Sequence, residues 1–219
     1  MCELKVKPQQ SCPRVVKTIM RKFLHVGCGS KTKENTTRGF AGGDWQEVRY
    51  DIDESVKPDI VGTMTDMSSI EDESCDAVFS SHNIEHLYAH DVPVALKEFL
   101  RVLKPNGFAI ITCPDLQSVC ELVAKDRLTD TAYESPAGPI APIDILYGFR
   151  SSMARGNLYM AHRCGFTEKV LVATLRGCGF KETASIKRGS PFFDLWIVGS
   201  KDSVGDETIR EIAKSHFPI

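Results

Sequence analysis

Two glycines and an aspartate occupy positions that suit a nucleotide-like ligand. An apolar run over 23–26 ends in Gly27-Cys28-Gly29, and Asp51 follows a second apolar run. Glycine lets the backbone approach a ligand closely, and a carboxylate at a strand end can accept hydrogen bonds from both hydroxyls of a ribose. The sequence therefore predicts a nucleoside-containing cofactor that lies across the carboxyl ends of parallel strands.

Two kinds of cofactor fit a strand, a glycine turn and an acid: a dinucleotide and S-adenosylmethionine. The dinucleotide fingerprint requires Gly-x-Gly-x-x-Gly at the start of a helix. Thr32 occupies the third glycine position, and the polar stretch 30–46 shows no helical periodicity. Because no helix N-terminus is evident to receive a pyrophosphate, S-adenosylmethionine is the better match.

A sheet is needed to position these residues. We interpret the regularly spaced apolar runs as strands, at 23–26, 47–50, 59–63, 75–80, 107–113, 180–187 and 192–199. Helices are expected over 13–21, 91–104, 115–127, from Thr167 to about Gly179, and over 206–214. In the second of these, Leu96, Phe99, Leu100 and Leu103 form an apolar stripe, and Pro105-Asn106-Gly107 should end it with a turn. The pattern predicts an α/β fold, a doubly wound, Rossmann-like, mostly parallel sheet with one antiparallel strand.

The chain length suits one domain with additions. We expect residues 1–219 to form this single domain, with a leader and helix in 1–22. The segment 128–165 is rich in proline and aromatic residues and has no clear periodicity. A stretch of this length in a compact domain usually serves as a lid or functional insertion, which is the role we predict for it.

Bulk composition excludes several classes of protein. The formal net charge is −2, and no apolar run approaches the length of a membrane span. We therefore expect no nucleic-acid partner and no membrane partner. None of the 8 cysteines forms a Cys-x-x-Cys pair, so reduced thiols and a cytoplasmic location are expected.

Motifs at successive strand ends extend the glycine-turn pattern. They are Val26-Gly27-Cys28-Gly29, Asp51-Ile52-Asp53, Thr65-Asp66-Met67, Ser81-His82-Asn83-Ile84-Glu85-His86-Leu87 and Arg101-Val102-Leu103-Lys104-Pro105-Asn106-Gly107. In this order they resemble the class I S-adenosylmethionine-dependent methyltransferases, in particular the small proteins of methyltransferase type 11. The resemblance is strongest over 24–116. It implies a seven-stranded sheet, S-adenosylmethionine as cofactor, and one methyltransferase domain.

The resemblance also implies which residues bind the cofactor. Asp51 should hold the ribose, Asp66 the adenine amino group, and the Met67 amide a ring nitrogen. The full expected set is His25, Gly27, Cys28, Gly29, Asp51, Ile52, Asp66, Met67, Ser81, His82 and His86. Lys31 replaces the usual third glycine of the family, so the carboxylate of the cofactor would be held by Lys31, Lys33 or the N-terminal segment.

His82-Asn83-Ile84-Glu85-His86 also matches the inverted zinc-protease pattern. Such a motif should lie inside a long helix with a distant third ligand, whereas this one begins where a strand ends. We therefore predict no metal site, and regard a zinc hydrolase as a minor alternative.

Histidines are the predicted catalytic residues, because imidazole titrates near neutral pH and can deprotonate an acceptor. We predict His162, in the late insertion, and His82. Asp144, Tyr147 and Arg150 are weaker candidates for acceptor contacts. Asp115 should cap a helix or face the crevice, and Trp45, Tyr147 and Phe149 should wall the cleft or pack in the core.

The predicted function is methyl transfer from S-adenosylmethionine to a small-molecule acceptor, such as a metabolite, a sugar or a natural-product intermediate. An activated sulfonium needs in-line alignment, exclusion of water and removal of one proton. The alternatives are an NAD(P)-dependent oxidoreductase and a non-catalytic cofactor-binding protein.

Overall fold

A computed structural model describes residues 20–218, and residues 1–19 and 219 lie outside that description. The helix expected over 13–21 falls almost entirely on residues outside the described part. Of its last two positions, Arg21 is the first residue of a strand.

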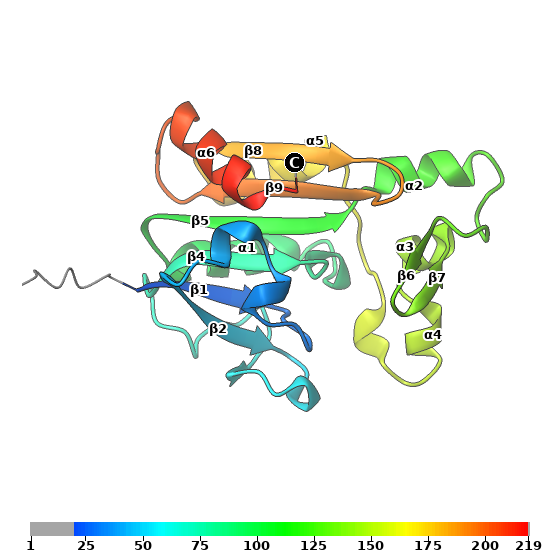
Figure 1. The fold of residues 1–219 in the computed structure, drawn as a ribbon, viewed down its shortest axis with the longest axis horizontal. Coiled ribbons are helices and arrows are strands. Elements are labelled where there is room, and N and C mark those ends of the chain that lie inside the picture. Colours follow the sequence, from blue (N-terminus) through cyan, green and yellow to red (C-terminus); the bar gives the residue numbers. More distant parts are fainter. Residues whose placement is uncertain (1–19, 219) are drawn as a thin grey trace, which may run out of the picture.

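A seven-stranded sheet forms the centre of the molecule (Figure 1). Its strands, in spatial order, are β3 (Ile60–Val61), β2 (Trp45–Asp51), β1 (Arg21–Val26), β4 (Cys75–Ser81), β5 (Leu103–Pro114), β9 (Asp194–Ser200) and β8 (Thr183–Arg188). β9 runs antiparallel to both β5 and β8, and the other strands are parallel to one another. The predicted doubly wound sheet with one antiparallel strand is confirmed.

Helices pack on both faces of this sheet, and others lie at the carboxyl ends of its parallel strands. They are α1 (Val92–Val102), α2 (Leu116–Val123), α3 (Pro142–Tyr147), α4 (Arg150–Met153), α5 (Glu168–Cys178) and α6 (Asp206–His216). α1 and α5 contribute Phe99 and Leu171 to the apolar core on one face. α6 contributes Ile209 to the core on the other face. None of the helices in residues 20–218 has the length and apolarity that a membrane crossing requires.

Alternation along β1 explains how one short strand serves both cores. Phe23 points into the core under α6, whereas Leu24 and Val26 point into the core under α1. All three side chains are buried. Successive side chains of a strand point to opposite faces, so a central strand must be apolar on both sides, as this one is.

The loops after β1 and β2 lack crossover α-helices. Within the stretch 30–46, the residues before β2 form two single-turn 3-10 helices, η1 (Lys33–Asn35) and η2 (Arg38–Phe40), in place of the α-helix that the polar sequence had argued against. A third turn, η3 (Glu54–Val56), follows β2. Phe40 of η2 stacks on Phe23 with ring centroids 4.2 Å apart, so this loop supplies core residues where other folds use a helix.

The boundary between α1 and β5 differs from the prediction. The helix ends at Val102, and the strand begins at Leu103, so the expected turn at Pro105-Asn106-Gly107 lies within β5. Leu103 pairs with Cys75, and a register shift follows before Phe108 pairs with Ala77. The turn residues therefore form a bulge, with Asn106 at φ +60°, a conformation that asparagine tolerates better than most residues.

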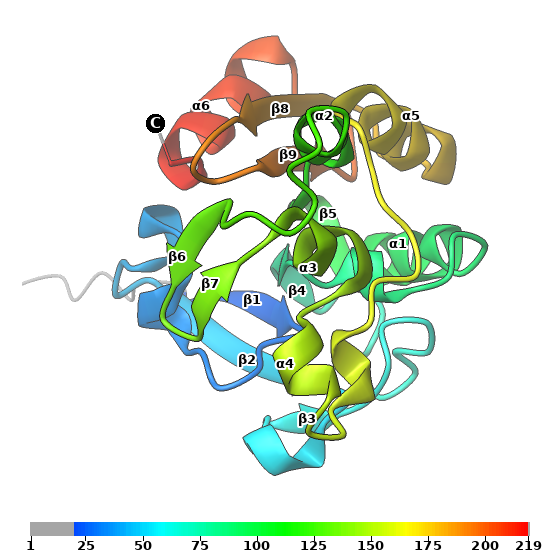
Figure 2. The ribbon, with the colours of Figure 1, turned by 90° about the vertical axis from the view of Figure 1, so that its right-hand side faces the viewer.

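The segment 128–165 lies at the carboxyl ends of the parallel strands, in front of the sheet in Figure 2. It contains a hairpin of β6 (Tyr133–Ser135) and β7 (Gly138–Ile140), then α3, α4 and the 3-10 turn η5 (Leu158–Met160). Ile140 and Ile145 pack with Val119 of α2 and with Phe193. This separate apolar cluster holds the segment over the edge of the sheet.

His216 at the end of α6 is buried beneath η2. Its Nδ1 lies 2.6 Å from the hydroxyl of Thr37, and its ring packs edge-on against Phe40 and Phe108. Burial lowers the pKa of His216 from 6.5 to about 4. The folded protein therefore holds this imidazole neutral under conditions where the unfolded chain would protonate it.

We predict that stability falls as the pH decreases from 6.5 toward 4. In that range the unfolded state binds a proton that the folded state does not, so protonation favours unfolding. Urea denaturation should show a free energy of unfolding about 2 kcal/mol lower at about pH 5 than at about pH 7.5 from this group. His216→Gln should lose that part of the pH dependence. An identical pH dependence in the two proteins would contradict the assignment.

Candidate functional site

A cavity of about 410 Å³ opens at the carboxyl ends of the parallel strands. Its inner wall comes from the loops that follow β1, β2, β3 and β4. Its outer wall comes from the segment 128–165, which contributes Asn157, Tyr159, Met160 and Arg163. The cavity therefore lies between the strand ends, where open α/β sheets bind ligands, and the segment 128–165.

The glycine loop after β1 depends on the absence of side chains. Gly27 and Gly29 line the cavity and have φ values of +66° and +53°, which other residues rarely adopt. A Cβ at Gly27 would lie 2.1 Å from Nδ2 of Asn83, whereas a Cβ at Gly29 would meet nothing within 4 Å. Gly27 therefore permits close packing of the loops, and Gly29 leaves its backbone bare next to the cavity.

Asp51 joins this loop to the end of β2. One carboxylate oxygen accepts a hydrogen bond from the backbone N–H of Gly29 at 2.7 Å. The other accepts from the N–H of Asp53 at 2.9 Å. Each carboxylate oxygen has a second lone pair, so Asp51 can still accept from a ligand in the cavity that it lines.

Arg49 stabilises the same loops, and the sequence analysis did not identify it. Its guanidinium donates to the carbonyl oxygens of Gly29 at 2.6 Å, Lys31 at 3.1 Å and Lys57 at 2.7 Å. An arginine two residues before the strand-end acid was the available signal. Planar guanidinium groups can bind several carbonyl oxygens at once, which suits Arg49 to connecting two loops.

The third strand end is arranged differently from the expectation. Asp66 is exposed and accepts a hydrogen bond from the Ser68 N–H at 3.1 Å. The Met67 N–H donates to the carboxylate of Glu98 on α1 at 2.7 Å. Asp66 borders a separate surface hollow beside α1, and neither residue lines the cavity.

Residues 63–65 line the cavity in place of Asp66 and Met67. The hydroxyl of Tyr50 holds this segment by donating to the carbonyl oxygens of Thr63 and Asp66, at 2.9 and 3.1 Å. The loop after β3 therefore reaches the cavity through residues 63–65, which precede the two residues that the sequence predicted.

Three other members of the expected cofactor set lie outside the cavity lining. His25 is buried, and its Nδ1 is 2.6 Å from a carboxylate oxygen of Glu47. Cys28 is buried, and burial raises the pKa of its thiol to about 11, as expected of an inert filler. The Ser81 hydroxyl is hydrogen-bonded to that of Thr112 at 2.9 Å.

Ile52, His82 and His86 do line the cavity. His82 has a left-handed backbone with φ +50°, and its Nδ1 lies 3.5 Å from Oε1 of Glu85. His86 belongs to the single-turn helix η4 (Ile84–His86) that follows β4. The polar groups expected after the fourth strand therefore face the site, except for Ser81.

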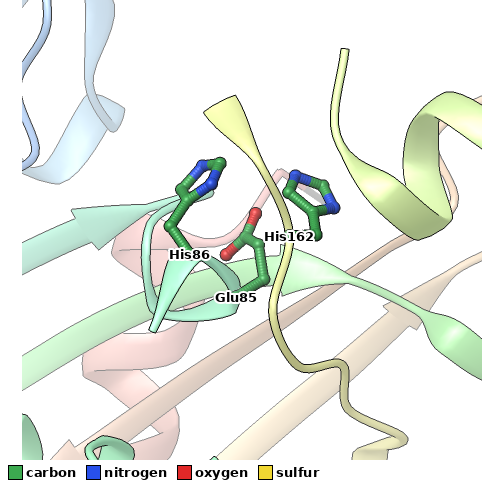
Figure 3. A group of neighbouring side chains, drawn as sticks. All are labelled: Glu85, His86 and His162. Atoms are coloured by element: carbon green, nitrogen blue, oxygen red, sulfur yellow. The ribbon is translucent and has the colours of Figure 1, made fainter. Parts of the chain in front are cut away.

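His162 lies one layer behind the cavity. Its ring packs edge-on against that of His86, with centroids 4.8 Å apart, and its Nδ1 lies 2.8 Å from the carbonyl oxygen of Ile145. Burial lowers the pKa of His162, so its imidazole is neutral near pH 7. Figure 3 shows Glu85, His86 and His162 gathered at this point.

The weaker candidates have structural partners. Arg150 forms an ion pair with Asp144 at 2.7 Å, and Asp115 caps α2 by accepting from the backbone of Gln117 and Ser118. Lys33 donates to the carbonyl oxygens of Gly42 and Trp45. Trp45 is in the core under α6, Phe149 packs against the cluster of the insertion, and Tyr147 is exposed.

The arrangement does not match a dinucleotide site. The loop that follows β1 continues into η1 and η2, and the described residues place no α-helix between β1 and β2. A pyrophosphate bound at the glycine loop would therefore lack the helix N-terminus that dinucleotide-binding folds provide. A cofactor without a pyrophosphate fits the loop, because Gly29 offers bare backbone and Asp51 offers acceptor oxygens.

Comparisons with known proteins agree with this geometry. Residues 24–111 match the methyltransferase domain family. No curated protein matches the sequence. Among solved structures, an S-adenosylmethionine-dependent methyltransferase of Methanosarcina mazei is similar, at 18% identity over 84% of this chain and 93% of that chain, with a TM-score of 0.55.

Two further structures share the fold. A methyltransferase of Archaeoglobus fulgidus is 15% identical over 83% of this chain and 86% of its own, with a TM-score of 0.52. The 1,6-didemethyltoxoflavin-N1-methyltransferase of Burkholderia thailandensis, solved with its acceptor and S-adenosylhomocysteine, is 14% identical over 84% of this chain and 72% of its own, with a TM-score of 0.52. Residues 24–111 thus match the methyltransferase domain family, and the chain shares the fold of S-adenosylmethionine-dependent methyltransferases.

Proposed function

We propose that this methyltransferase acts on a small-molecule acceptor, such as a metabolite, a sugar or a natural-product intermediate. The observation that carries the proposal is the two-sided cavity. Strand-end loops form its inner wall, and the segment 128–165 forms its outer wall. An acceptor bound under such a cover is enclosed on several sides, which favours a small molecule over an extended polymer surface. The Burkholderia enzyme with the same fold is described with a small-molecule acceptor.

We further propose where the cofactor lies. Gly27 and Gly29 face its methionine portion, Asp51 accepts from the ribose hydroxyls, and residues 63–65 border the adenine together with Ile52. Support comes from their common place on the cavity wall. The segment 128–165 would then act as the lid of the site.

Bound S-adenosylmethionine supplies a sulfonium whose methyl carbon is open to in-line attack. The chain has to align the acceptor, exclude water and accept a proton. His82 lines the cavity and is the histidine we assign to proton removal. His86 lies between His162 and the cavity. His162, the other predicted catalytic histidine, could therefore act on the acceptor only by way of the His86 ring.

Arg163 is the residue of the outer wall that suits an anionic acceptor. Its guanidinium lies 4.8 Å from the ring centroid of Tyr88, and both residues line the cavity. Arginine binds carboxylates and phosphates through paired hydrogen bonds. The sequence had suggested Arg150 for this role, but that residue is paired with Asp144.

The proposed function can be tested with S-adenosylmethionine that carries an isotopic label on its methyl group. The enzyme is incubated with a cell extract, and the extract is then separated into low-mass, protein and nucleic-acid fractions. We expect enzyme-dependent label in the low-mass fraction. Label confined to protein or nucleic acid would overturn the small-molecule assignment.

Asp51→Ala should weaken binding of S-adenosylhomocysteine by about 1–3 kcal/mol, the scale of a lost hydrogen bond to a charged group. Asp66→Ala is the matched variant, since it also removes an acid after a strand but from outside the cavity. Isothermal titration should show little change for that variant. If Asp66→Ala lost much of its affinity for S-adenosylhomocysteine and Asp51→Ala lost none, Asp66 would be the residue that binds the adenine base. Asp51 would then not bind the ribose.

Arg163→Met should reduce transfer to the labelled low-mass product by about tenfold, the effect of losing roughly 1.4 kcal/mol of acceptor binding. Its affinity for S-adenosylhomocysteine should stay close to that of the wild type. Equal losses in cofactor affinity and in turnover would show instead that Arg163 supports the cofactor.

A further inference from the structure

Glu85 is a buried carboxylate without a hydrogen-bond partner. The residue is 1% exposed, and neither side-chain oxygen forms a hydrogen bond with any residue of 20–218. A buried charge with no partner is strongly unfavourable, so native structures nearly always pair or ligate such a group. The ion-pair contact that the described residues provide is that of His82, whose Nδ1 lies 3.5 Å from Oε1, so the carboxylate still has lone pairs free for a cation.

Two imidazoles flank this carboxylate. One ligand atom from each of Glu85, His86 and His162 lies within 4.8 Å of the others, and Figure 3 shows the carboxylate between the two rings. The residues come from η4 and from the segment after η5, which are far apart in the sequence. The geometry thus brings together two nitrogens and one carboxylate around a common point.

The histidines are oriented as metal ligands usually are. Nδ1 of His86 lies 3.1 Å from the carbonyl oxygen of Ala161, and Nδ1 of His162 lies 2.8 Å from that of Ile145. A carbonyl can only accept, so each Nδ1 carries the proton and each Nε2 keeps its lone pair. Metal-binding histidines are typically fixed in this way by a carbonyl or carboxylate at the other ring nitrogen.

The backbone holds the two segments in register. The N–H groups of Arg163 and Cys164 both donate to the carbonyl oxygen of Glu85, at 2.8 and 3.2 Å. The N–H of His162 donates to the carbonyl of Tyr147 at 3.1 Å. The carboxylate and the two rings therefore need little rearrangement to share one ion.

We propose that Glu85, His86 and His162 bind a divalent transition-metal cation beside the methyl-transfer cavity. Two histidines and one glutamate form a donor set that Zn²⁺ uses in sites with an open coordination position. His86 also lines the cavity, so an oxygen of the acceptor lying there would complete the coordination. His82, with Nδ1 at 3.5 Å from Glu85, supports the carboxylate from the cavity side.

This site revises the expectation of no metal. The sequence argument required a long helix and a distant third ligand. The motif lies on a single 3-10 turn, as its place after a strand suggested, but His162 supplies the third ligand. The acceptor-binding role rests on the proposed function, whereas cation binding by these residues does not.

Metal binding can be tested on the full-length protein without cofactor or acceptor. The protein is treated with EDTA, freed of chelator and titrated with Zn²⁺ in a calorimeter. We expect one ion per chain. Replacement by Co²⁺ should give visible absorption bands typical of a low-coordinate site with nitrogen ligands. Absence of stoichiometric binding by the wild type would overturn the proposal.

Two variants test the proposed ligands, and a third serves as the control. Glu85→Gln and His162→Ala should weaken Zn²⁺ binding by more than the ~10–100-fold that loss of a supporting partner causes. His90→Ala is the matched control, because His90 is exposed and outside the cluster, and it should bind as the wild type does. Unchanged binding in the first two variants, or equal loss in the control, would refute the site.

Two further measurements keep the test decisive. If Glu85→Gln does not fold by circular dichroism, His162→Ala and the Co²⁺ spectrum of the wild type decide the outcome. Binding of S-adenosylhomocysteine should persist in the folded variants. Zn²⁺ binding without any small-molecule methylation would refute the proposed acceptor class and leave the metal site standing. Small-molecule methylation without Zn²⁺ binding would refute the metal site and leave the proposed acceptor class standing.

Discussion

The carboxylate of Asp51 is the interaction on which the inner wall of the cavity depends. It accepts from the backbone of Gly29 and of Asp53, and so it joins the loop after β1 to the loop after β2. Arg49 joins the same loops through their carbonyl oxygens. Neither loop leads into an α-helix that would fix it, so these charge-assisted hydrogen bonds replace the usual support. The same acid thus shapes the glycine loop and presents acceptor oxygens to the cavity.

The far side of the site depends on a different kind of contact. The segment 128–165 is attached to the sheet through the cluster of Val119, Ile140, Ile145 and Phe193 and through backbone hydrogen bonds to Glu85. Those bonds place His162 next to His86 and bring Arg163 to the cavity wall. One short stretch of chain therefore serves both the acceptor side of the cavity and the cluster around Glu85.

The central strands could be predicted because their signals are local. The apolar run of β1, the glycines after it and Asp51 follow from alternation and turn chemistry alone. The alternation of strands and helices predicted a mostly parallel sheet with one antiparallel strand, whereas the number of seven strands was expected from the family resemblance. The bulge within β5 was missed, since Pro105-Asn106-Gly107 has the composition of a turn and only pairing with β4 places it in a strand.

The parts of the site that could not be predicted depend on contacts between distant segments. Asp66 comes after a strand of only two residues and borders a separate hollow beside α1, whereas residues 63–65 line the cavity. His162 lies opposite Glu85 only because the insertion folds back onto η4. Hydrophobic periodicity does not indicate which distant segments pack together. The sequence therefore showed a motif that resembles a metal site, but not the third ligand that we propose for it.

Replacement of the first crossover helix by a loop also constrains how the protein is made. Thr37 and Phe40 both contact His216 at the end of α6, and 179 positions separate Thr37 from His216. On the ribosome, that face of the sheet stays uncovered until the last helix has been synthesised. Contacts of such long sequence separation slow folding and leave apolar strands exposed meanwhile. This face of the sheet is therefore expected to need chaperone protection until α6 has been synthesised.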